Sequence, residues 1–178
     1  EVLVNGATGG VGSIAIDMLA GRGYEVVALT SKKESDSYLK QLGAKRILLR
    51  SELQMGTKPM ETQLWAGAID NLGGEVLSWL IRTTKDWGTV ASVGMAQSGE
   101  LKGTVFPFIL RGVNLVGANS VTIPRVPRLA IWQRIASDLK PRHLDVIGAR
   151  TVTLDELPNA FDGYIKGVIT GRTLVKIS

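Results

Sequence analysis

Short apolar runs and amphipathic stretches alternate along the chain from its first residues. The apolar runs are rich in Val, Ile and Leu and nearly continuous, which is typical of strands in a parallel sheet covered by helices on both faces. Six such strands are predicted, over residues 2–5, 24–30, 46–49, 64–70, 88–94 and 113–118. Their alternation with helices predicts a doubly wound α/β fold with a six-stranded parallel sheet.

The helices are predicted between and after these strands, over residues 11–22, 34–42, 74–84, 126–139 and 157–166. In the first of them, Ile14, Ala15, Met18 and Leu19 recur at helical spacing and are expected to form the packed face. Residues 51–63 contain Gly and Pro and are expected to form a loop or a broken helix.

Two further strands are predicted at residues 152–154 and 173–177, on either side of the last helix. They are surplus to a complete six-stranded sheet, and no partner strand for them is evident in the chain. The chain also opens inside a predicted strand, with no segment leading into it. We therefore expect the sequence to be cut from a longer protein, whose remainder provides the partner for the last strands.

A glycine-rich turn joins the first predicted strand to the first predicted helix, with the sequence GATGGVG at residues 6–12. With Ala7, Gly9 and Gly12 as the key positions, it is a dinucleotide fingerprint that has Ala in place of the first Gly. Gly9 lets a pyrophosphate approach the backbone, and Gly12 lets the helix pack closely on the sheet. Free N–H groups and the helix dipole would then face the phosphates. The motif predicts a dinucleotide site in a Rossmann-type fold; the alternative is a glycine turn without a ligand.

The end of the second predicted strand distinguishes the two nicotinamide dinucleotides. An NAD site usually places Asp or Glu there to hold the ribose hydroxyls. This chain has Ser31, Lys32 and Lys33 at that place, and Arg50 follows the neighbouring third strand. Cationic side chains suit a 2′-phosphate, so the sequence favours NADP(H) as the cofactor. The alternative is that the two lysines are only solvated surface residues.

Composition narrows the class of protein further. The chain has 178 residues, a formal net charge of +5, no cysteine and one histidine. The basic residues are scattered, which does not favour nucleic-acid binding, and no apolar run approaches the roughly 18 residues of a membrane span. Without cysteine, disulfides and thiol chemistry are excluded and a structural zinc site is not expected. This composition fits a cytoplasmic protein without a metal site.

Short-chain dehydrogenases are a rival interpretation, because glycines 6, 10 and 12 also fit their spacing. Their chemistry needs a Tyr followed by Lys four residues later. The tyrosines at positions 24, 38 and 164 are followed at that spacing by Ala28, Leu42 and Val168. The chain therefore lacks the catalytic residues that a short-chain dehydrogenase needs.

Five separated blocks of the chain resemble medium-chain dehydrogenase/reductases: residues 4–33, YLKQLGA, WAGAIDNLGG, TVFPFILRGVNLVGANSV and GRTLVKIS. The similarity is greatest to the zinc-independent quinone oxidoreductase branch, with its YhdH/YhfP-like and acrylyl-CoA reductase-like proteins. It covers essentially the whole chain. It implies an NADP(H)-binding Rossmann domain at residues 1–150 and, at residues 151–178, a strand–helix–strand segment that returns toward a GroES-like catalytic domain.

The resemblance also implies a set of cofactor contacts. The pyrophosphate would be cradled by Thr8, Gly9, Gly10 and Val11. The 2′-phosphate would be surrounded by Ser31, Lys32, Lys33 and Arg50. The nicotinamide half would be lined by Met95, Ile109 and Ser120. The family's proposed catalytic Tyr belongs to the N-terminal domain, so no catalytic residue is assigned in this chain.

The function that the resemblance implies is reduction of a quinone or an activated C=C bond, such as an enoyl-CoA, by hydride transfer from NADPH without a metal. The chain alone is expected to bind the cofactor with little or no turnover. It also implies a homodimer formed through the edge strand at residues 112–120, because a bare apolar edge would otherwise aggregate. The alternative is a nucleotide-sensing regulatory Rossmann domain without catalysis, which would leave the last two strands unexplained.

Three other features are expected to have structural roles. Asp70, at the end of a strand, is expected to form a turn or a cap. His143 lies in a polar stretch with no partner nearby in the sequence and is expected to be a surface residue. The four tryptophans are expected to pack in the core or at an interface; they are Trp65, Trp79, Trp87 and Trp132.

Overall fold

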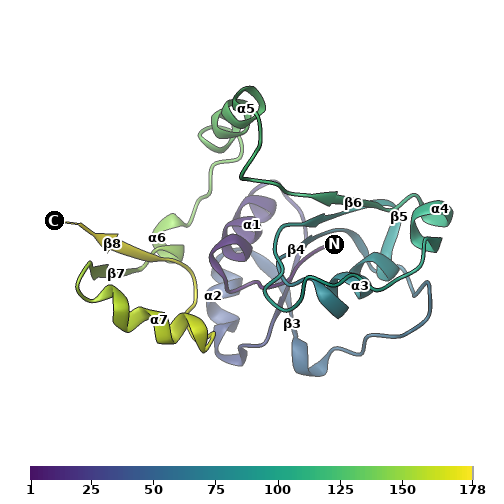
Figure 1. Cartoon of the computed structure of the whole chain (residues 1–178), viewed down its shortest axis with the longest axis horizontal. Helices are drawn as coiled ribbons and strands as arrows, with labels where there is room; N and C mark the ends of the chain where they lie inside the picture. Colours follow the sequence, from purple (N-terminus) through teal and green to yellow (C-terminus); the bar gives the residue numbers. More distant parts are fainter. Residues whose placement is uncertain (178) are drawn as a thin grey trace.

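The computed structural model, which describes residues 1–177, is built around a six-stranded sheet with the strand order β3-β2-β1-β4-β5-β6 (Figure 1). All neighbouring strands in it are parallel. The strands are β1 (Val2–Val4), β2 (Val26–Thr30), β3 (Ala44–Leu49), β4 (Trp65–Asp70), β5 (Thr84–Ser92) and β6 (Asn114–Gly117). The doubly wound α/β fold is thus confirmed, with the order of the strands reversing between β1 and β4.

Helices cover both faces of this sheet. Successive residues of its central strands point to opposite sides, so each strand contributes apolar side chains to both helix layers. Leu3 packs with Val27 and helix α3, whereas Val2 and Val4 pack with helices α1 and α2. These helices are α1 (Gly10–Gly21), α2 (Asp36–Gln41) and α3 (Gly74–Thr83), and short 3-10 turns occur at Lys33–Ser35 and Arg50–Glu52. Trp65 and Trp79 are buried in the α3 layer, with ring centroids 5.9 Å apart in an edge-to-face arrangement.

The packed face of α1 differs from the predicted one. Its buried residues are Gly12, Ser13, Ile16 and Asp17. The residues predicted to be packed, at positions 14, 15, 18 and 19, are only half-buried. Ile14, Ala15 and Leu19 do pack against the core as partly buried residues, but the prediction missed the most deeply buried positions, most of which are not apolar side chains. The helix instead lies against the sheet through Gly12 and Ser13, and a later segment of the chain covers Asp17.

Two short helices, α4 (Phe106–Arg111) and α6 (Leu144–Ile147), were not predicted. Strand β5 also begins earlier than expected, at Thr84, because Thr84 pairs with Trp65 before the register shifts. At this irregularity Trp87 has a positive φ of 61° and an 81% exposed side chain. Trp87 lies against Gly112 at the end of α4. It therefore packs on the surface, as exposed Trp132 does, and not in the core.

The last part of the chain forms a second, two-stranded sheet from β7 (Arg150–Thr153) and β8 (Thr173–Lys176). The two strands are parallel and are connected by helix α7 (Leu157–Ile165). The expectation that they lack a partner in this chain was wrong, because they pair with each other. The domain border at residue 150 stays a prediction, and Ser178 of the predicted 151–178 segment lies outside the described residues.

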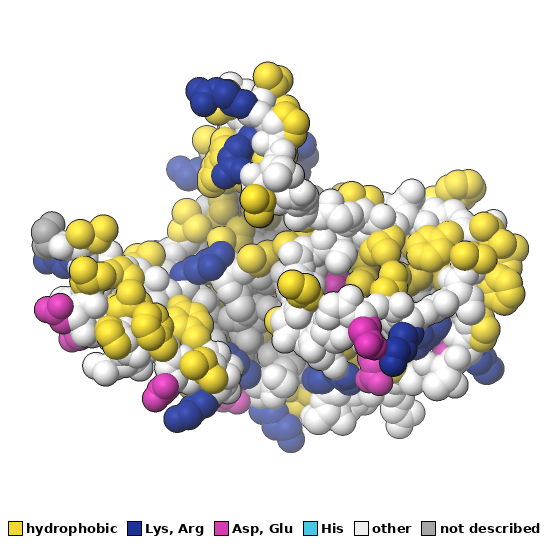
Figure 2. All heavy atoms as spheres, in the orientation of Figure 1, with side chains coloured by type: hydrophobic (Ala, Val, Ile, Leu, Met, Phe, Trp, Pro, Cys, Tyr) yellow, Lys and Arg dark blue, Asp and Glu magenta, His cyan; other side chains and the backbone are white. Residues whose placement is uncertain are grey.

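Helix α5 (Arg125–Ile135) projects from the body of the molecule (Figure 1). It has no buried residue, although Leu129 and Trp132 were predicted to pack, and Figure 2 shows its apolar side chains on the surface. It also ends before residue 139, the predicted end. In the described part of the chain, no helix is long and apolar enough to cross a membrane.

Candidate functional site

The glycine turn folds tightly between β1 and α1. Gly6 has a positive φ of 56°, and its carbonyl accepts the N–H of Gly9 at 2.9 Å. A Cβ on Gly12 would lie 2.9 Å from the Cα of Ala7 and closer still to the carbonyl oxygen of Gly6. Position 12 therefore has no room for a side chain, as the fingerprint requires.

The N-terminus of α1 opens at the surface. Gly9 is its N-cap, and within residues 1–177 no side chain caps it by a hydrogen bond. The first N–H groups of a helix have no acceptor inside the helix, and the helix dipole adds partial positive charge there. Gly9 and Val11 are exposed, Gly10 is half-buried and Thr8 is buried. The turn thus presents backbone donors and no side-chain acceptor, a suitable arrangement for an anion.

A buried polar network holds the ends of β1 and β4 together below this turn. Asn5 donates from its side-chain amide to Asp70, and its side-chain oxygen accepts the N–H of Asn71 at 2.6 Å. Asp70 also accepts the N–H of Gly73 at 3.0 Å. Both Asn5 and Asp70 are fully buried. Asp70 therefore forms the turn after β4, as predicted, and it has no opening toward a substrate.

Two of the four residues predicted for the 2′-phosphate, Ser31 and Arg50, come together at the carboxyl ends of the strands with Thr8, which was predicted for the pyrophosphate. Thr8, Ser31 and Arg50 line a pocket of about 90 Å³. The other residues that line it are Gly6, Leu29, Thr30 and Leu72. The Arg50 guanidinium lies 3.9 Å from the carboxylate of Glu75, a largely exposed side chain. Arg50 is thus held at the rim of the pocket by a single weak ion pair.

Lys32 does not point into this pocket. Its ammonium donates to the carbonyl of Ile169 and, at 3.4 Å, to the hydroxyl of Thr170. Burial lowers the pKa of Lys32 below its usual value. Lys33 begins the 3-10 turn after β2 and is exposed. The structure therefore separates the two lysines, which the sequence had grouped.

Residues 169–172, here called the covering loop, lie on the glycine turn. The N–H of Gly171 donates to the carbonyl of Thr8 at 2.8 Å, and Gly9 and Gly171 form a parallel β-bridge. The Arg172 side chain lies over Gly10, where a Cβ would collide with its Nε. Sequence reasoning assigned no role to Gly171 and Arg172. The only signal for them was the GRTLVKIS block, which was noted for its resemblance alone.

The residues predicted for the nicotinamide half are only partly brought together. Met95 lies beside Val93 in one hollow at the end of β5, and Ser120 lies beside Val93 in a second hollow under α5. Met95 and Ser120 therefore flank Val93. Ile109 is on α4, has a 68% exposed side chain, and lines neither hollow.

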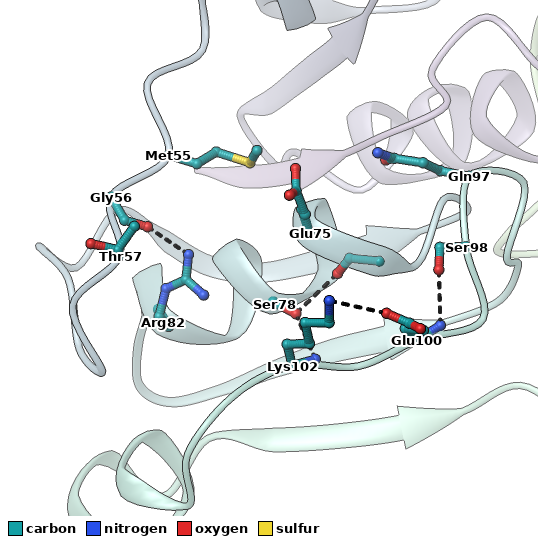
Figure 3. A pocket seen from close by; sticks show the side chains of 11 residues that line it. Met55, Gly56, Thr57, Glu75, Ser78, Arg82, Gln97, Ser98, Glu100 and Lys102 are labelled. Atoms are coloured by element: carbon teal, nitrogen blue, oxygen red, sulfur yellow. Dashed lines mark hydrogen bonds and ion pairs between the residues drawn. The ribbon is translucent and has the colours of Figure 1, made fainter.

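A larger cavity of about 480 Å³ lies on the outer side of α3 (Figure 3). Its lining carries both signs of charge, with Lys102 paired to Glu100 at 3.2 Å and Arg82 donating to the carbonyl of Gly56 at 2.7 Å. It contains none of the predicted site residues, so size alone does not identify the functional site.

His143 is not an unpartnered surface residue. Its ring Nδ1 lies 2.8 Å from a carboxylate oxygen of Asp17, and its side chain is 33% exposed. The sequence showed no partner near His143 because the two residues are 126 positions apart. No local pattern could indicate the pair.

The described residues do not assemble a metal site: within positions 1–177, no three His, Cys, Asp or Glu side chains lie together. The glycine turn, by contrast, has the shape and polarity of a dinucleotide site. Its fold and turn define the class of protein, an α/β domain of the Rossmann type.

Comparison with known proteins identifies the family. Residues 10–136 match the family model described as zinc-binding dehydrogenase. The chain belongs to this family, in the branch of medium-chain dehydrogenase/reductases that contains YhfP, YhdH and AcuI. The zinc of the family's description has no counterpart in a cluster of ligating side chains among residues 1–177.

Three relatives illustrate the similarity. Acrylyl-CoA reductase AcuI of Ruegeria pomeroyi is 44% identical over 178 residues, which cover 99% of this chain and 54% of that protein. The structure of the YhdH oxidoreductase of Salmonella enterica in complex with NADP is 42% identical, with a TM-score of 0.94 over 99% of this chain and 54% of that one. Bacillus subtilis YhfP with NAD bound is 47% identical, with the same TM-score and coverage.

The chain spans about half the length of the relatives it matches. Solved relatives hold NADP, NADPH or NAD. The similarity thus confirms the family and the kind of cofactor that its members bind, a nicotinamide dinucleotide.

Proposed function

We propose that this chain is the NADP(H)-binding part of an NADPH-dependent reductase that acts on a quinone or on an activated C=C bond such as that of an enoyl-CoA. The observation that carries the proposal is the glycine turn, with Gly9 and Val11 exposed, beside a pocket lined by Ser31 and Arg50. The similarity to an acrylyl-CoA reductase supports the substrate class.

The chain's own residues would bind and orient the cofactor. The backbone N–H groups at the start of α1 and the Arg172 guanidinium over Gly10 would hold the pyrophosphate. Ser31 and Arg50 would hold the 2′-phosphate, while Val93, Met95 and Ser120 would lie along the nicotinamide half. Bound NADPH would supply the hydride, and the substrate would reach it from the part of the protein that relatives have in addition.

The preference for NADP(H) over NAD(H) rests on charge. The side chains that line the pocket at the ends of β2 and β3 include Arg50 and no carboxylate. A ribose with two free hydroxyls would lack its usual acidic partner there, whereas a 2′-phosphate would gain a charge-assisted hydrogen bond.

Calorimetric titration with NADPH and, separately, NADH tests this proposal. We expect NADPH to bind more tightly, and the double variant Arg50→Ala/Ser31→Ala to lose about 10- to 100-fold of its NADPH affinity with little change for NADH. Arg125→Ala on exposed helix α5 is the matched control and should change neither affinity. Equal or tighter binding of NADH by the unmodified protein would contradict the preference for NADP(H).

We also propose that two copies pair along β6, the last strand of the sheet. Val116 on this strand is 51% exposed, and the neighbouring α4 exposes Ile109 and Leu110. Such an apolar edge needs a cover. Figure 2 shows apolar side chains gathered over α4 and beside β6.

Light scattering at tens of micromolar checks the pairing. The intact protein is expected to have the mass of a dimer, and Val116→Glu is expected to convert it to a monomer because the charge would be buried in the interface. Val168→Glu, at an exposed site in the loop after α7, should leave the mass unchanged. A monomer of the unmodified protein would count against the proposal.

A further inference from the structure

Asp17 is a fully buried carboxylate on α1 that sequence reasoning did not single out. One of its oxygens accepts the backbone N–H groups of Arg142 and His143 at 2.6 and 2.9 Å. The other lies 2.8 Å from Nδ1 of His143 and 3.5 Å from Nε of Arg142. The carboxylate thus binds one short stretch of chain through several donors.

These donors make the buried charge tolerable. Burial acts to raise the pKa of Asp17, but the hydrogen bonds from His143 and Arg142 outweigh it, so the pKa lies below its usual value. A buried carboxylate with this many donors is a strong and directional anchor.

The anchored stretch leads directly to the covering loop. His143 is the N-cap of α6, and its carbonyl accepts the N–H of Ile147 at 3.0 Å. Ile147 is buried, and its own carbonyl accepts the N–H of Arg172 at 2.7 Å. Gly171, the residue before, donates to Thr8 in the glycine turn. Four consecutive links therefore join Asp17, in the middle of α1, to the turn at the start of the same helix.

The position of Arg172 depends on this connection. The Arg172 side chain lies over Gly10, beside the N–H groups that would face a pyrophosphate. The covering loop has a second attachment through Lys32, but that bond reaches Ile169 and Thr170 only. Residue 172 is bonded to Ile147 at the end of α6, and the chain then enters β8, which pairs with β7.

We propose that Asp17 is a positioning residue of the dinucleotide site: by holding residues 142–143 and helix α6 against α1, it keeps Gly171 and Arg172 seated on the glycine turn. The proposal rests on the function proposed above. In this proposal Asp17 does not contact the cofactor. It positions the residues that would bind the pyrophosphate, which NADPH and NADH have in common.

Hydrogen exchange of the full-length protein, read with dinucleotide affinity, tests the proposal. In Asp17→Ala, the amides of Gly171 and Arg172 should exchange about tenfold faster, while those of Val27 and Ala28 in β2 stay unchanged. Calorimetry should show NADPH and NADH weakened by the same factor, about five- to tenfold, because the pyrophosphate is common to both. A purely structural role of Asp17 would instead speed exchange throughout the domain.

Two variants provide the comparison. Asp17→Asn keeps an acceptor for the two backbone N–H groups and can donate to Nδ1 of His143, so it should restore most of the protection and affinity. Asp162→Ala, at an exposed position of α7, should match the unmodified protein in every reading. Folded Asp17→Ala with unchanged exchange at residues 171 and 172 overturns the proposal.

Two outcomes remain to be separated. If Asp17→Ala does not fold, His143→Ala takes its place, with about threefold faster exchange at residues 171 and 172 expected and unchanged exchange overturning the proposal. If the unmodified protein binds neither dinucleotide, the proposed function fails. Exchange at Gly171 and Arg172 then still decides whether Asp17 anchors the covering loop.

Discussion

Replacing Gly12 with alanine is expected to abolish dinucleotide binding and to lower the free energy of unfolding by about 3 kcal/mol. The added Cβ would meet backbone atoms of Gly6 and Ala7, which cannot move aside as the end of a flexible side chain can. Either α1 shifts away from the sheet or the turn opens. Both responses displace the N–H groups that would hold the pyrophosphate. Urea unfolding and calorimetry with NADPH measure the two effects.

Gly103→Ala is the matched control for this prediction. A Cβ at Gly103 would meet no atom within 4 Å, and the residue is exposed. Its unfolding free energy should change by less than about 0.5 kcal/mol. If Gly12→Ala has near-normal stability and NADPH binding, the close packing of α1 on the turn is not needed for either property, and the prediction is contradicted.

Replacing Asn5 with alanine is expected to lower the free energy of unfolding by about 3 kcal/mol at neutral pH. The change removes a donor to buried Asp70 and leaves the N–H of Asn71 without its side-chain acceptor. Burial already raises the pKa of Asp70, because the ionised carboxylate is poorly solvated there. The loss of the Asn5 amide, which favours the ionised form, should raise that pKa further.

The pH dependence of this effect has a definite sign. A carboxyl group whose pKa is raised by folding reduces stability as the pH rises through that pKa. The difference between Asn5→Ala and the unmodified protein should therefore be largest at neutral pH and smaller in acid, where Asp70 is protonated. Denaturant titrations at both pH values measure it, with Asn159→Ala on the exposed face of α7 as the control. A difference that grows as the pH falls would contradict this account of Asp70.

Local patterns were sufficient for the sheet and for the turn. The central strands are apolar on both faces because helices cover both, so β1, β2 and β4 were predicted to within two residues of their observed limits. The fingerprint was equally local, since the steric need for Gly12 arises from residues 6 and 7 of the same turn. The pattern was less informative for α1, where a glycine, a serine and a carboxylate are buried together with Ile16.

The candidate site was only partly predictable. Ser31 and Arg50 meet in one pocket because β2 and β3 are neighbours and end at the same edge of the sheet. Lys32 was grouped with them on charge alone, and the structure turns it to the covering loop instead. Residues that follow neighbouring parallel strands lie at the same edge of the sheet. The direction in which a long side chain points from that edge depends on what packs beside it.

The sequence by itself was enough to determine the fold class and the glycine turn, because each depends on neighbours within a few positions. It also showed directly that no carboxylate follows β2 at residues 31–33. Only the tertiary structure decided that β7 pairs with β8, that Arg172 lies over Gly10 and that Asp17 holds His143. In the last two cases the partners are more than a hundred positions apart. Their contact is a consequence of how completed elements pack, and no property of either residue's own segment specifies it.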